Sequence, residues 1–123
     1  MNVLTPLDSD FNYEQCKSLY ENNQYLLEDD EIFDNVIKNT FFYSFFIGRK
    51  HIGCIYYYEQ NNKLYINAVA YRGTHLINIA CLKESLTWWN CDIYARTHHK
   101  TAIYTILECG FKKIGKNLYK YER

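Results

Sequence analysis

The sequence contains only one proline and five glycines, and nowhere does it have a long apolar run. A membrane-spanning helix needs about 20 consecutive apolar residues, so none is expected. Residues 1–10 lack the basic segment and apolar stretch of a secretory signal. The scarcity of proline and glycine also argues against a flexible linker or a low-complexity tail. We therefore expect one soluble, cytoplasmic domain over residues 1–123, with no membrane partner.

Cysteine pairs with metal-ligand spacing are missing as well. The five cysteines lie far apart, form no Cys-x-x-Cys motif and are odd in number: Cys16, Cys54, Cys81, Cys91 and Cys109. This pattern argues against a disulfide framework and against a zinc site. The adjacent His98 and His99 have no third or fourth ligand nearby, so they predict no metal site either. We interpret the cysteines as reduced, small apolar residues, with a reactive thiol among them as the open alternative.

The chain has no net charge, because 14 acidic residues balance 14 basic ones. The balance conceals an asymmetry, since residues 1–40 carry nine of the acids and two of the bases. Such an asymmetry bears on binding partners rather than on fold. The basic second part leaves binding or modification of nucleic acid as an alternative, which the zero net charge and the acidic first third disfavour.

Five basic residues near the end of the chain have two open interpretations: Lys112, Lys113, Lys116, Lys120 and Arg123. In one, they lie on a solvated strand edge, where lysine discourages pairing with other chains. In the other, they attract an anion such as a phosphate group.

Apolar periodicity along the chain predicts alternating strands and helices. Asn12 followed by Gln15 is typical of a helix N-cap, and Gly110 of a C-cap. In chain order we expect a strand over residues 2–6, helices over 12–22 and up to about 39, strands over 41–47, 51–59 and 63–69, a long helix after Gly73, a strand over 91–97, a helix over 100–109 and a strand over 113–121. The order β-α-α-β-β-β-α-β-α-β predicts an α/β (α+β) fold, a mixed central sheet flanked by helices.

Aromatic residues are abundant, with thirteen tyrosines and seven phenylalanines. Tyr56, Tyr57 and Tyr58 follow one another on a predicted central strand, so they alternate between its faces, in the core or in a binding groove. Trp88 and Trp89 are expected to anchor the long helix to the sheet. The apolar residues of that helix predict one broad inward face: Leu76, Ile79, Ala80, Leu86 and Trp89.

Two junctions of the chain carry a resemblance to a known family. The segment Ala70-Tyr71-Arg72-Gly73-Thr74-His75-Leu76-Ile77 joins a strand to a helix, and Glu108-Cys109-Gly110-Phe111 ends the last helix. Together with the element order, they resemble the GNAT N-acetyltransferase superfamily over essentially the whole chain. A glycine-containing turn at a helix N-terminus exposes backbone N–H groups that bind phosphate oxygens. The resemblance implies that this turn binds the pyrophosphate of acetyl-CoA, a co-substrate, and that no metal is needed.

The resemblance assigns eight residues to acetyl-CoA. Three would offer backbone groups to the pantetheine arm: Asn67, Ala68 and Val69. Five would surround the pyrophosphate: Arg72, Gly73, Thr74, His75 and Leu76.

The sequence departs from the family pattern at both junctions. The family's phosphate motif is Gln or Arg, two residues, Gly, any residue, then Gly or Ala; here Ala70, Gly73 and His75 stand at those positions. His75 then either narrows the turn or donates to the phosphate itself. Many members carry a proton-donating tyrosine four residues before the Gly-Phe step, where this chain has Ile106. Tyr104 lies about 200° around the helix from that position.

The resemblance implies transfer of an acyl group, most directly acetyl, from CoA to a primary amine within a ternary complex. A proton acceptor is then required, because a lysine-like amine has a pKa of about 10.4. Glu59, Tyr65, His99 and Tyr104 are the candidates, and we name Tyr104 and His99 as catalytic residues. The lost motif residues leave open a second interpretation, a GNAT-shaped binding or assembly protein that does not use CoA.

The resemblance also places the first two helices beside the acceptor. Their acidic residues predict a cationic small molecule or a protein lysine as the amine: Glu28, Asp29, Asp30, Glu31 and Asp34. An exposed end strand in such sheets often pairs with a second copy, so a homodimer stays open.

Overall fold

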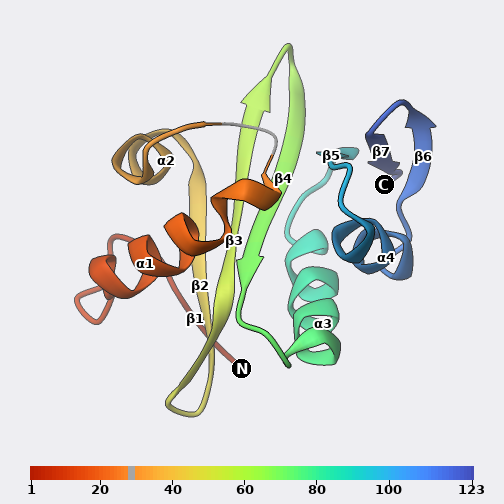
Figure 1. The fold of residues 1–123 in the computed structure, drawn as a ribbon. Coiled ribbons are helices and arrows are strands. Elements are labelled where there is room, and N and C mark those ends of the chain that lie inside the picture. The colour runs from red at the N-terminus through yellow and green to blue at the C-terminus, as the bar shows by residue number, and fades with distance from the viewer. Residues whose placement is uncertain (28–29) are drawn as a thin grey trace.

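A computed structural model describes residues 1–27 and 30–123 of the chain. Within these residues seven strands form one sheet in the order β1-β2-β3-β4-β5-β7-β6, and only the β4–β5 pair among them is parallel. Helices α1 and α2 cover one face of the sheet, and α3 and α4 cover the other (Figure 1). This arrangement confirms the predicted mixed sheet flanked by helices.

The elements follow the predicted order closely. The strands are β1 (Asn2–Leu4), β2 (Phe41–Ile47), β3 (Lys50–Gln60), β4 (Lys63–Ala70), β5 (Ile93–Arg96), β6 (Lys112–Gly115) and β7 (Leu118–Tyr121). The helices are α1 (Tyr13–Asn23), the 3-10 turn η1 (Gln24–Leu26), α2 (Phe33–Asn39), α3 (His75–Leu86) and α4 (Lys100–Glu108). None of the helices within the described ranges is long and apolar enough to cross a membrane.

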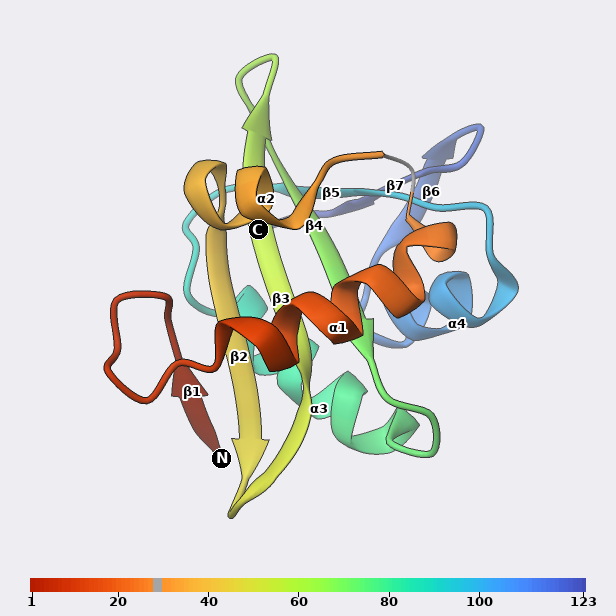
Figure 2. The ribbon, with the colours of Figure 1, turned by 60° about the vertical axis from the view of Figure 1, so that its left-hand side comes forward.

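Each face of the sheet has its own apolar core. On the α3 and α4 side the core includes Phe45, Tyr57 and Ile93. On the other side α1 runs across β3 and β4 (Figure 2) and packs over Phe42 and Tyr56. Tyr56 and Tyr57 are at most 1% exposed. Adjacent residues of β3 thus fill opposite cores, which confirms the core interpretation of the tyrosine run.

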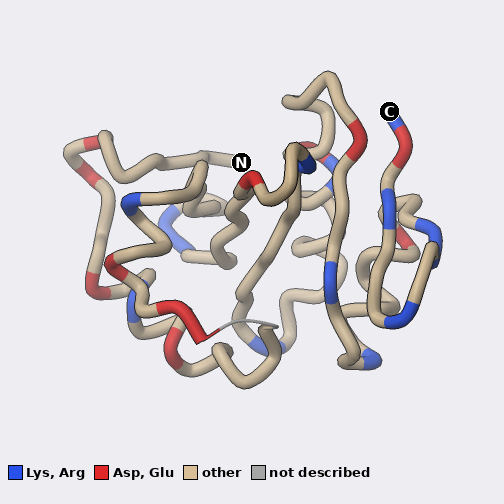
Figure 3. The backbone as a smooth tube through the Cα atoms, turned by 90° about the horizontal axis from the view of Figure 1, so that it is seen from above, with Lys and Arg blue, Asp and Glu red and all other residues tan. Residues whose placement is uncertain are grey.

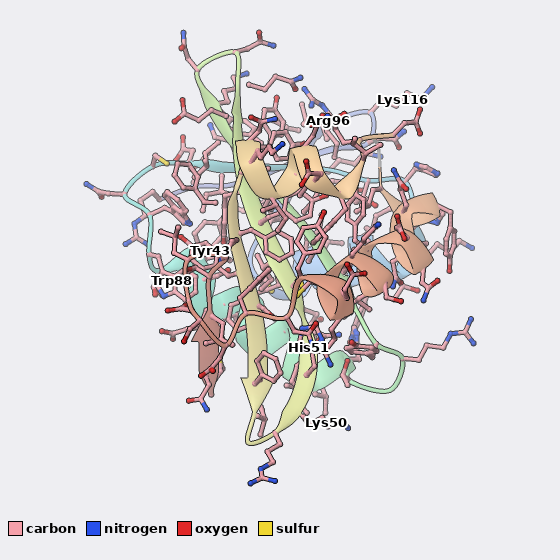
Figure 4. All side chains as sticks on the ribbon, turned by 90° about the vertical axis from the view of Figure 1, so that its left-hand side faces the viewer. Tyr43, Lys50, His51, Trp88, Arg96 and Lys116 are labelled. Atoms are coloured by element: carbon pink, nitrogen blue, oxygen red, sulfur yellow. The ribbon has the colours of Figure 1, made fainter. Side chains whose placement is uncertain are left out.

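Several local predictions are confirmed. The Asn12 side chain accepts a hydrogen bond from the Gln15 backbone N–H at 3.0 Å, which caps α1. Trp88 stacks on Phe45 with ring centroids 5.9 Å apart. It also meets Tyr43, labelled beside it in Figure 4, at 4.8 Å. The tryptophans after α3 therefore anchor that helix to the sheet.

Two predictions were wrong in detail. The expected final strand over residues 113–121 is a hairpin of β6 and β7, because Asn117 adopts a left-handed φ of 56° and reverses the chain. Leu76, expected on the inward face of the long helix, is 80% exposed, and Ala80 is exposed too. The face of α3 that is buried carries Cys81, Leu82, Ser85 and Leu86.

The charged residues follow the asymmetry of the sequence. Viewed from above, basic segments mark the C-terminal hairpin, and an acidic segment ends next to the residues that are not described (Figure 3). β6 is an edge strand, and Lys112 and Lys113 are exposed on it. This position fits the solvated-edge interpretation of the basic cluster.

Candidate functional site

A cleft opens where β4 and β5 diverge. β4 pairs with β3 over its whole length, but with β5 only at Leu64 and Tyr65. Beyond Tyr65 the second half of β4 has no strand partner on that side in the described part of the chain. This open edge lines a cleft of about 540 Å³, together with the first turns of α3 and α4 and the end of α1.

The turn before α3 supplies the cleft with backbone donors. Gly73 has a φ of +81°, a conformation that L side chains rarely adopt, and an added Cβ would meet open space. The Thr74 hydroxyl donates to the Tyr71 carbonyl at 2.7 Å and makes no capping hydrogen bond to α3. The first backbone N–H groups of α3 therefore keep their donor capacity for a ligand.

The first turn of α4 borders the same cleft. Its N-cap, His99, also makes no side-chain capping bond. The His99 Nε2 atom is buried and has no hydrogen-bond partner among the described residues, although the residue lines the cleft. Its ring lies edge-on to Tyr25 at 6.3 Å. A buried ring nitrogen without a partner costs free energy unless a ligand or a water molecule supplies the missing hydrogen bond.

The cleft is positively charged. Arg72, Arg96 and Lys100 line it, and none of its described lining residues carries a carboxylate. The Arg96 guanidinium, labelled in Figure 4, donates to the Tyr65 hydroxyl at 2.9 Å and to the Gln60 amide oxygen. Both partners are neutral, so no described carboxylate pairs with Arg96. Two helix N-termini add their partial positive charges, so the cleft favours an anion.

Most of the residues assigned to acetyl-CoA meet at this cleft. Its lining includes Asn67, Ala68, Val69, Arg72, Gly73 and His75. Thr74 and Leu76 do not line it: Thr74 is 3% exposed beneath the turn, and Leu76 points to solvent on the outer side of α3.

The candidate catalytic residues are separated. His99 and Ile106 line the cleft, whereas Tyr104 is 54% exposed and does not. The Tyr104 ring stacks on His75 with centroids 5.1 Å apart, so it lies at the outer rim. Of the other candidates, Glu59 is exposed near the far end of β3 and Tyr65 is buried under Arg96. Neither belongs to the cleft lining.

Sequence reasoning missed the residues that close the cleft on the α1 side. Tyr25, Leu26 and Leu27 line it, and Tyr25 is 68% exposed. The run Tyr25-Leu26-Leu27 between the two helices was the available sequence signal, because consecutive apolar residues outside a predicted helix or strand indicate a surface that contacts something. Tyr71 also lines the cleft, and burial raises the pKa of its hydroxyl.

The acidic residues predicted for the acceptor side are placed only in part. Glu28 and Asp29 lie outside the described residues, and Asp30 is exposed. Asp34 forms an ion pair with Lys38 at 2.8 Å and accepts from the Tyr13 hydroxyl at 3.3 Å. The Lys38 ammonium and this hydroxyl lower the pKa of Asp34. Asp34 therefore belongs to the surface of α2 rather than to the cleft lining.

Three solved structures, two of them of acetyltransferases, share this fold. A protein from Streptococcus mutans matches with a TM-score of 0.69 at 14% identity, covering 99% of both chains. A Bacillus subtilis acetyltransferase in complex with CoA matches at 0.61 and 14% identity, covering 93% of this chain and 79% of that one. A GNAT family acetyltransferase from Elizabethkingia anophelis with acetyl-CoA bound matches at 0.62 and 13% identity, covering 99% and 97%. No protein-family model and no curated protein matches the sequence.

Proposed function

We propose that this chain, which has the fold of the GNAT acetyltransferases, is an acyl-CoA-dependent N-acyltransferase that transfers acetyl most directly to a primary amine. One observation carries the proposal: two helix N-termini without side-chain caps and three basic residues converge on a cleft whose described lining has no carboxylate. That combination suits the phosphates of a CoA ester. Two of the structural relatives contain CoA or acetyl-CoA, which supports the same ligand.

Different parts of the cleft would hold different parts of acyl-CoA. The Gly73 turn and the first N–H groups of α3 would bind the pyrophosphate, with Arg72 nearby. The edge of β4 at residues 67–69, which does not pair with β5, would exchange backbone hydrogen bonds with the pantetheine amides, as an added strand does. His75, held against Tyr104, would donate from its ring to a phosphate oxygen, a role that a small residue cannot take.

The proton of the attacking amine needs an acceptor in the cleft. Bound acyl-CoA supplies a thioester whose carbonyl carbon the amine attacks, with release of the CoA thiol. Presenting a lysine-like amine in neutral form at pH 7 costs about 4–5 kcal/mol. The partnerless Nε2 of His99 is the best-placed acceptor, directly or through water, whereas Tyr104 lies at the rim. His99→Gln should then lower kcat and leave the acetyl-CoA affinity unchanged; a matching loss of affinity would assign His99 to binding instead.

The amine would enter from the side of η1, where Tyr25 to Leu27 form an apolar wall. A cationic acceptor is supported by the acidic residues between α1 and α2, of which Asp30 is exposed. Steady-state kinetics of Asp30→Lys should show a raised KM for a diamine such as spermidine and an unchanged KM for acetyl-CoA. Equal changes in both constants would contradict this acceptor class.

Calorimetric titration with acetyl-CoA tests the function most directly. We expect micromolar binding by the wild-type chain and at least tenfold weaker binding by His75→Glu, which places a negative charge in the cleft. Leu76→Glu is the matched control, because the adjacent side chain carries the same new charge on the outer side of α3. Both glutamates should be equally tolerated by the fold. Equal losses of acetyl-CoA affinity in the two variants would contradict the proposal that the phosphates bind in the cleft.

A second candidate function is a GNAT-shaped binding protein that does not use CoA. Two observations favour it: His75 occupies the place of a small residue at the turn, and Ile106 lines the cleft where a proton donor is common in this fold. Absence of binding by the wild-type chain at millimolar acetyl-CoA or CoA would select this function over the transferase.

A further inference from the structure

A buried cluster of potential ligands lies on the opposite face of the sheet from α3. Cys16 of α1 meets His51 and Cys54 of β3, and the two sulfur atoms and a ring nitrogen lie within 4.8 Å of one another. Cys16 and Cys54 are 1% exposed and His51 is 6% exposed. Figure 4 labels His51 on the face that α1 covers. The acyl-CoA cleft uses none of these three side chains.

A β-bulge places His51 and Cys54 on the same face. Residues three apart on a regular strand point to opposite faces. Here Phe45 is opposite Gly53 and Phe46 is opposite His51, so Ile52 is the extra residue. A Cβ at Gly53 would come within 2.6 Å of the Val69 carbonyl oxygen, so glycine is required at this close approach of β3 to β4.

The imidazole of His51 is oriented by hydrogen bonds at both nitrogen atoms. Its Nδ1 lies 2.7 Å from the Tyr71 hydroxyl, and its Nε2 lies 2.8 Å from the Ser44 hydroxyl and 3.7 Å from Cys54 Sγ. In the tautomer whose Nδ1–H donates to Tyr71, the Nε2 lone pair accepts from the Ser44 hydroxyl and lies beside Cys54 Sγ, so a metal ion would have to displace the Ser44 hydrogen bond. A metal-binding histidine characteristically has such a partner on its other nitrogen.

The two thiols differ in acidity. Hydrogen bonds from Cys54, His51 and Ser44 lower the pKa of Cys16 to about 5, against the effect of burial. Burial, followed by the neighbouring Cys16 thiol, raises the pKa of Cys54. Zinc binds thiolates, so both thiols would release their protons when the ion binds.

We propose that Cys16, His51 and Cys54 bind one zinc ion, with the fourth position facing Ser44. Tetrahedral zinc places two sulfur ligands about 3.8 Å apart, so ligand atoms within 4.8 Å of one another need to close by about 1 Å at most. Ser44 Oγ lies 3.5 Å from Cys16 Sγ and 2.8 Å from His51 Nε2, on the fourth side of the cluster.

Charge balance selects a divalent ion. Two thiolates and Zn²⁺ sum to zero, whereas a monovalent ion would leave a net negative charge in a buried site, which is costly. The contacts of the cluster, Ser44, Phe46 and Tyr71, are neutral. Tyr71, which contacts His51, is 37% exposed at the edge of the cluster. The ion would join α1 to β3 and, through Tyr71, would steady the segment that leads to Gly73.

Cobalt substitution tests the proposal without any acyl-CoA. The full chain is reduced with a phosphine, freed of metal with a chelator, and titrated with Co²⁺, in a Cys91→Ser background that removes the exposed thiol. We expect thiolate-to-cobalt charge transfer in the near ultraviolet and the visible bands of tetrahedral cobalt, saturating at one equivalent. One equivalent of Zn²⁺ should abolish both sets of bands and raise the melting temperature by about 5 °C or more.

Single variants assign the ligands. Cys54→Ser and His51→Gln should lose the tetrahedral bands, whereas Cys81→Ser, which alters an equally buried cysteine on α3, should keep them. Far-ultraviolet circular dichroism verifies that each variant is folded. A wild-type chain that binds cobalt only weakly and octahedrally, and retains less than about a tenth of an equivalent of zinc on gel filtration, would overturn the proposal. Bands that persist in Cys54→Ser would also overturn it.

Discussion

The two halves of β4 have the same strand on one side and different surroundings on the other. In the first half, Leu64 and Tyr65 pair with both β3 and β5, and Leu64 is buried in the core. In the second half, residues 66–70 pair with β3 alone, and their other edge lines the cleft. The beginning of this strand therefore holds two halves of the sheet together, and its end lines the cleft.

The comparison shows that a small sheet can form a binding cleft by the separation of two of its own strands, without an inserted loop. The two parallel strands diverge after the Tyr65–Tyr94 pair, where β4 continues along β3 to Ala70 and β5 continues along β7 to Arg96. A ligand or water at the divergence can bond to backbone groups that face the cleft. Substitutions beside the first half should consequently change the free energy of unfolding, and substitutions beside the second half should change acetyl-CoA affinity.

The largest expected effect is a loss of stability on substitution next to the first half of β4, which pairs with both β3 and β5. Ile93 is fully buried and pairs with Leu64, so Ile93→Ala should lower the free energy of unfolding by about 2–5 kcal/mol. Urea denaturation followed by circular dichroism measures this, with Leu76→Ala, at an exposed site, changing it by less than about 0.5 kcal/mol. Acetyl-CoA affinity of the folded fraction should stay the same. A tenfold loss of that affinity would contradict the assignment of stability to the first half of β4 and of ligand binding to the second.

Removing positive charge from the cleft beside the second half of β4 should have the next largest effect, a loss of acetyl-CoA affinity. The double variant Arg72→Ala, Lys100→Ala removes two lining cations, each worth about 1 kcal/mol to a phosphate at close range in a water-like medium. Acetyl-CoA should bind at least about tenfold more weakly by calorimetry, and the salt dependence of binding should decrease. The urea midpoint should not move. Unchanged affinity would mean that the phosphates lie elsewhere.

Gly73→Ala should change both measurements modestly, because the turn belongs to the fold and to the site. An alanine at a φ of +81° is strained by about 1–2 kcal/mol, although its Cβ meets open space. Part of the strain should appear as lower stability and part as weaker acetyl-CoA binding through a displaced turn. Gly48→Ala is a matched control, since Gly48 also has a positive φ and an open Cβ position but lies in the β2–β3 turn. It should lower stability alone; an equal effect on binding would refute the assignment of the turn.

The smallest expected effect concerns the far side of β5, where β7 pairs. The Asp92 carboxylate accepts from the Arg123 backbone N–H at 2.9 Å and lies 3.4 Å from the Lys120 ammonium. These contacts lower the pKa of Asp92, with the backbone N–H as the main cause. Its contribution to stability is therefore fully present above the ordinary carboxyl pKa of about 3.9 and is lost as the pH falls through the lowered value.

Urea midpoints of Asp92→Asn and the wild-type chain should accordingly differ slightly at pH 7 and converge at about pH 2. Asp10→Asn serves as a control that removes an exposed carboxyl in the loop before α1. If the two urea midpoints moved further apart as the pH fell, the ionised Asp92 carboxylate would not be the stabilising group.

The fold was largely predictable because its signals are local. Alternation in residues 41–69, the Asn12 cap and the Gly110 step each depend on neighbours within a few residues, and each specified an element correctly. The C-terminal hairpin was missed because its two-residue turn, Lys116-Asn117, lacks the Asn-Gly or Asp-Gly pair that is typical of such turns, although Asn117 adopts the left-handed conformation. Leu76 was misplaced because an exposed leucine fits a helical period as well as a buried one does.

The site was less predictable, since it depends on how distant segments meet. The turn at Gly73 could be found from its sequence context, and the structure places it at the cleft. The wall at Tyr25 and the free Nε2 of His99 arise only when α1 and α4 approach each other across the cleft. The scattered cysteines predicted no metal site, because Cys16 is separated from His51 by most of two helices and a strand. The proposed zinc site departs from that prediction.

The bulge at Ile52 affects how related chains should be compared. Two ligands on one face of a regular strand stand two positions apart, as His-x-Cys, but the inserted residue makes them His51-Ile52-Gly53-Cys54 here. A relative without the bulge would carry the same pair with one residue fewer. An alignment that treats β3 as ungapped would then set its histidine against Ile52, so the gap belongs inside the strand, at a position where gaps are normally penalised.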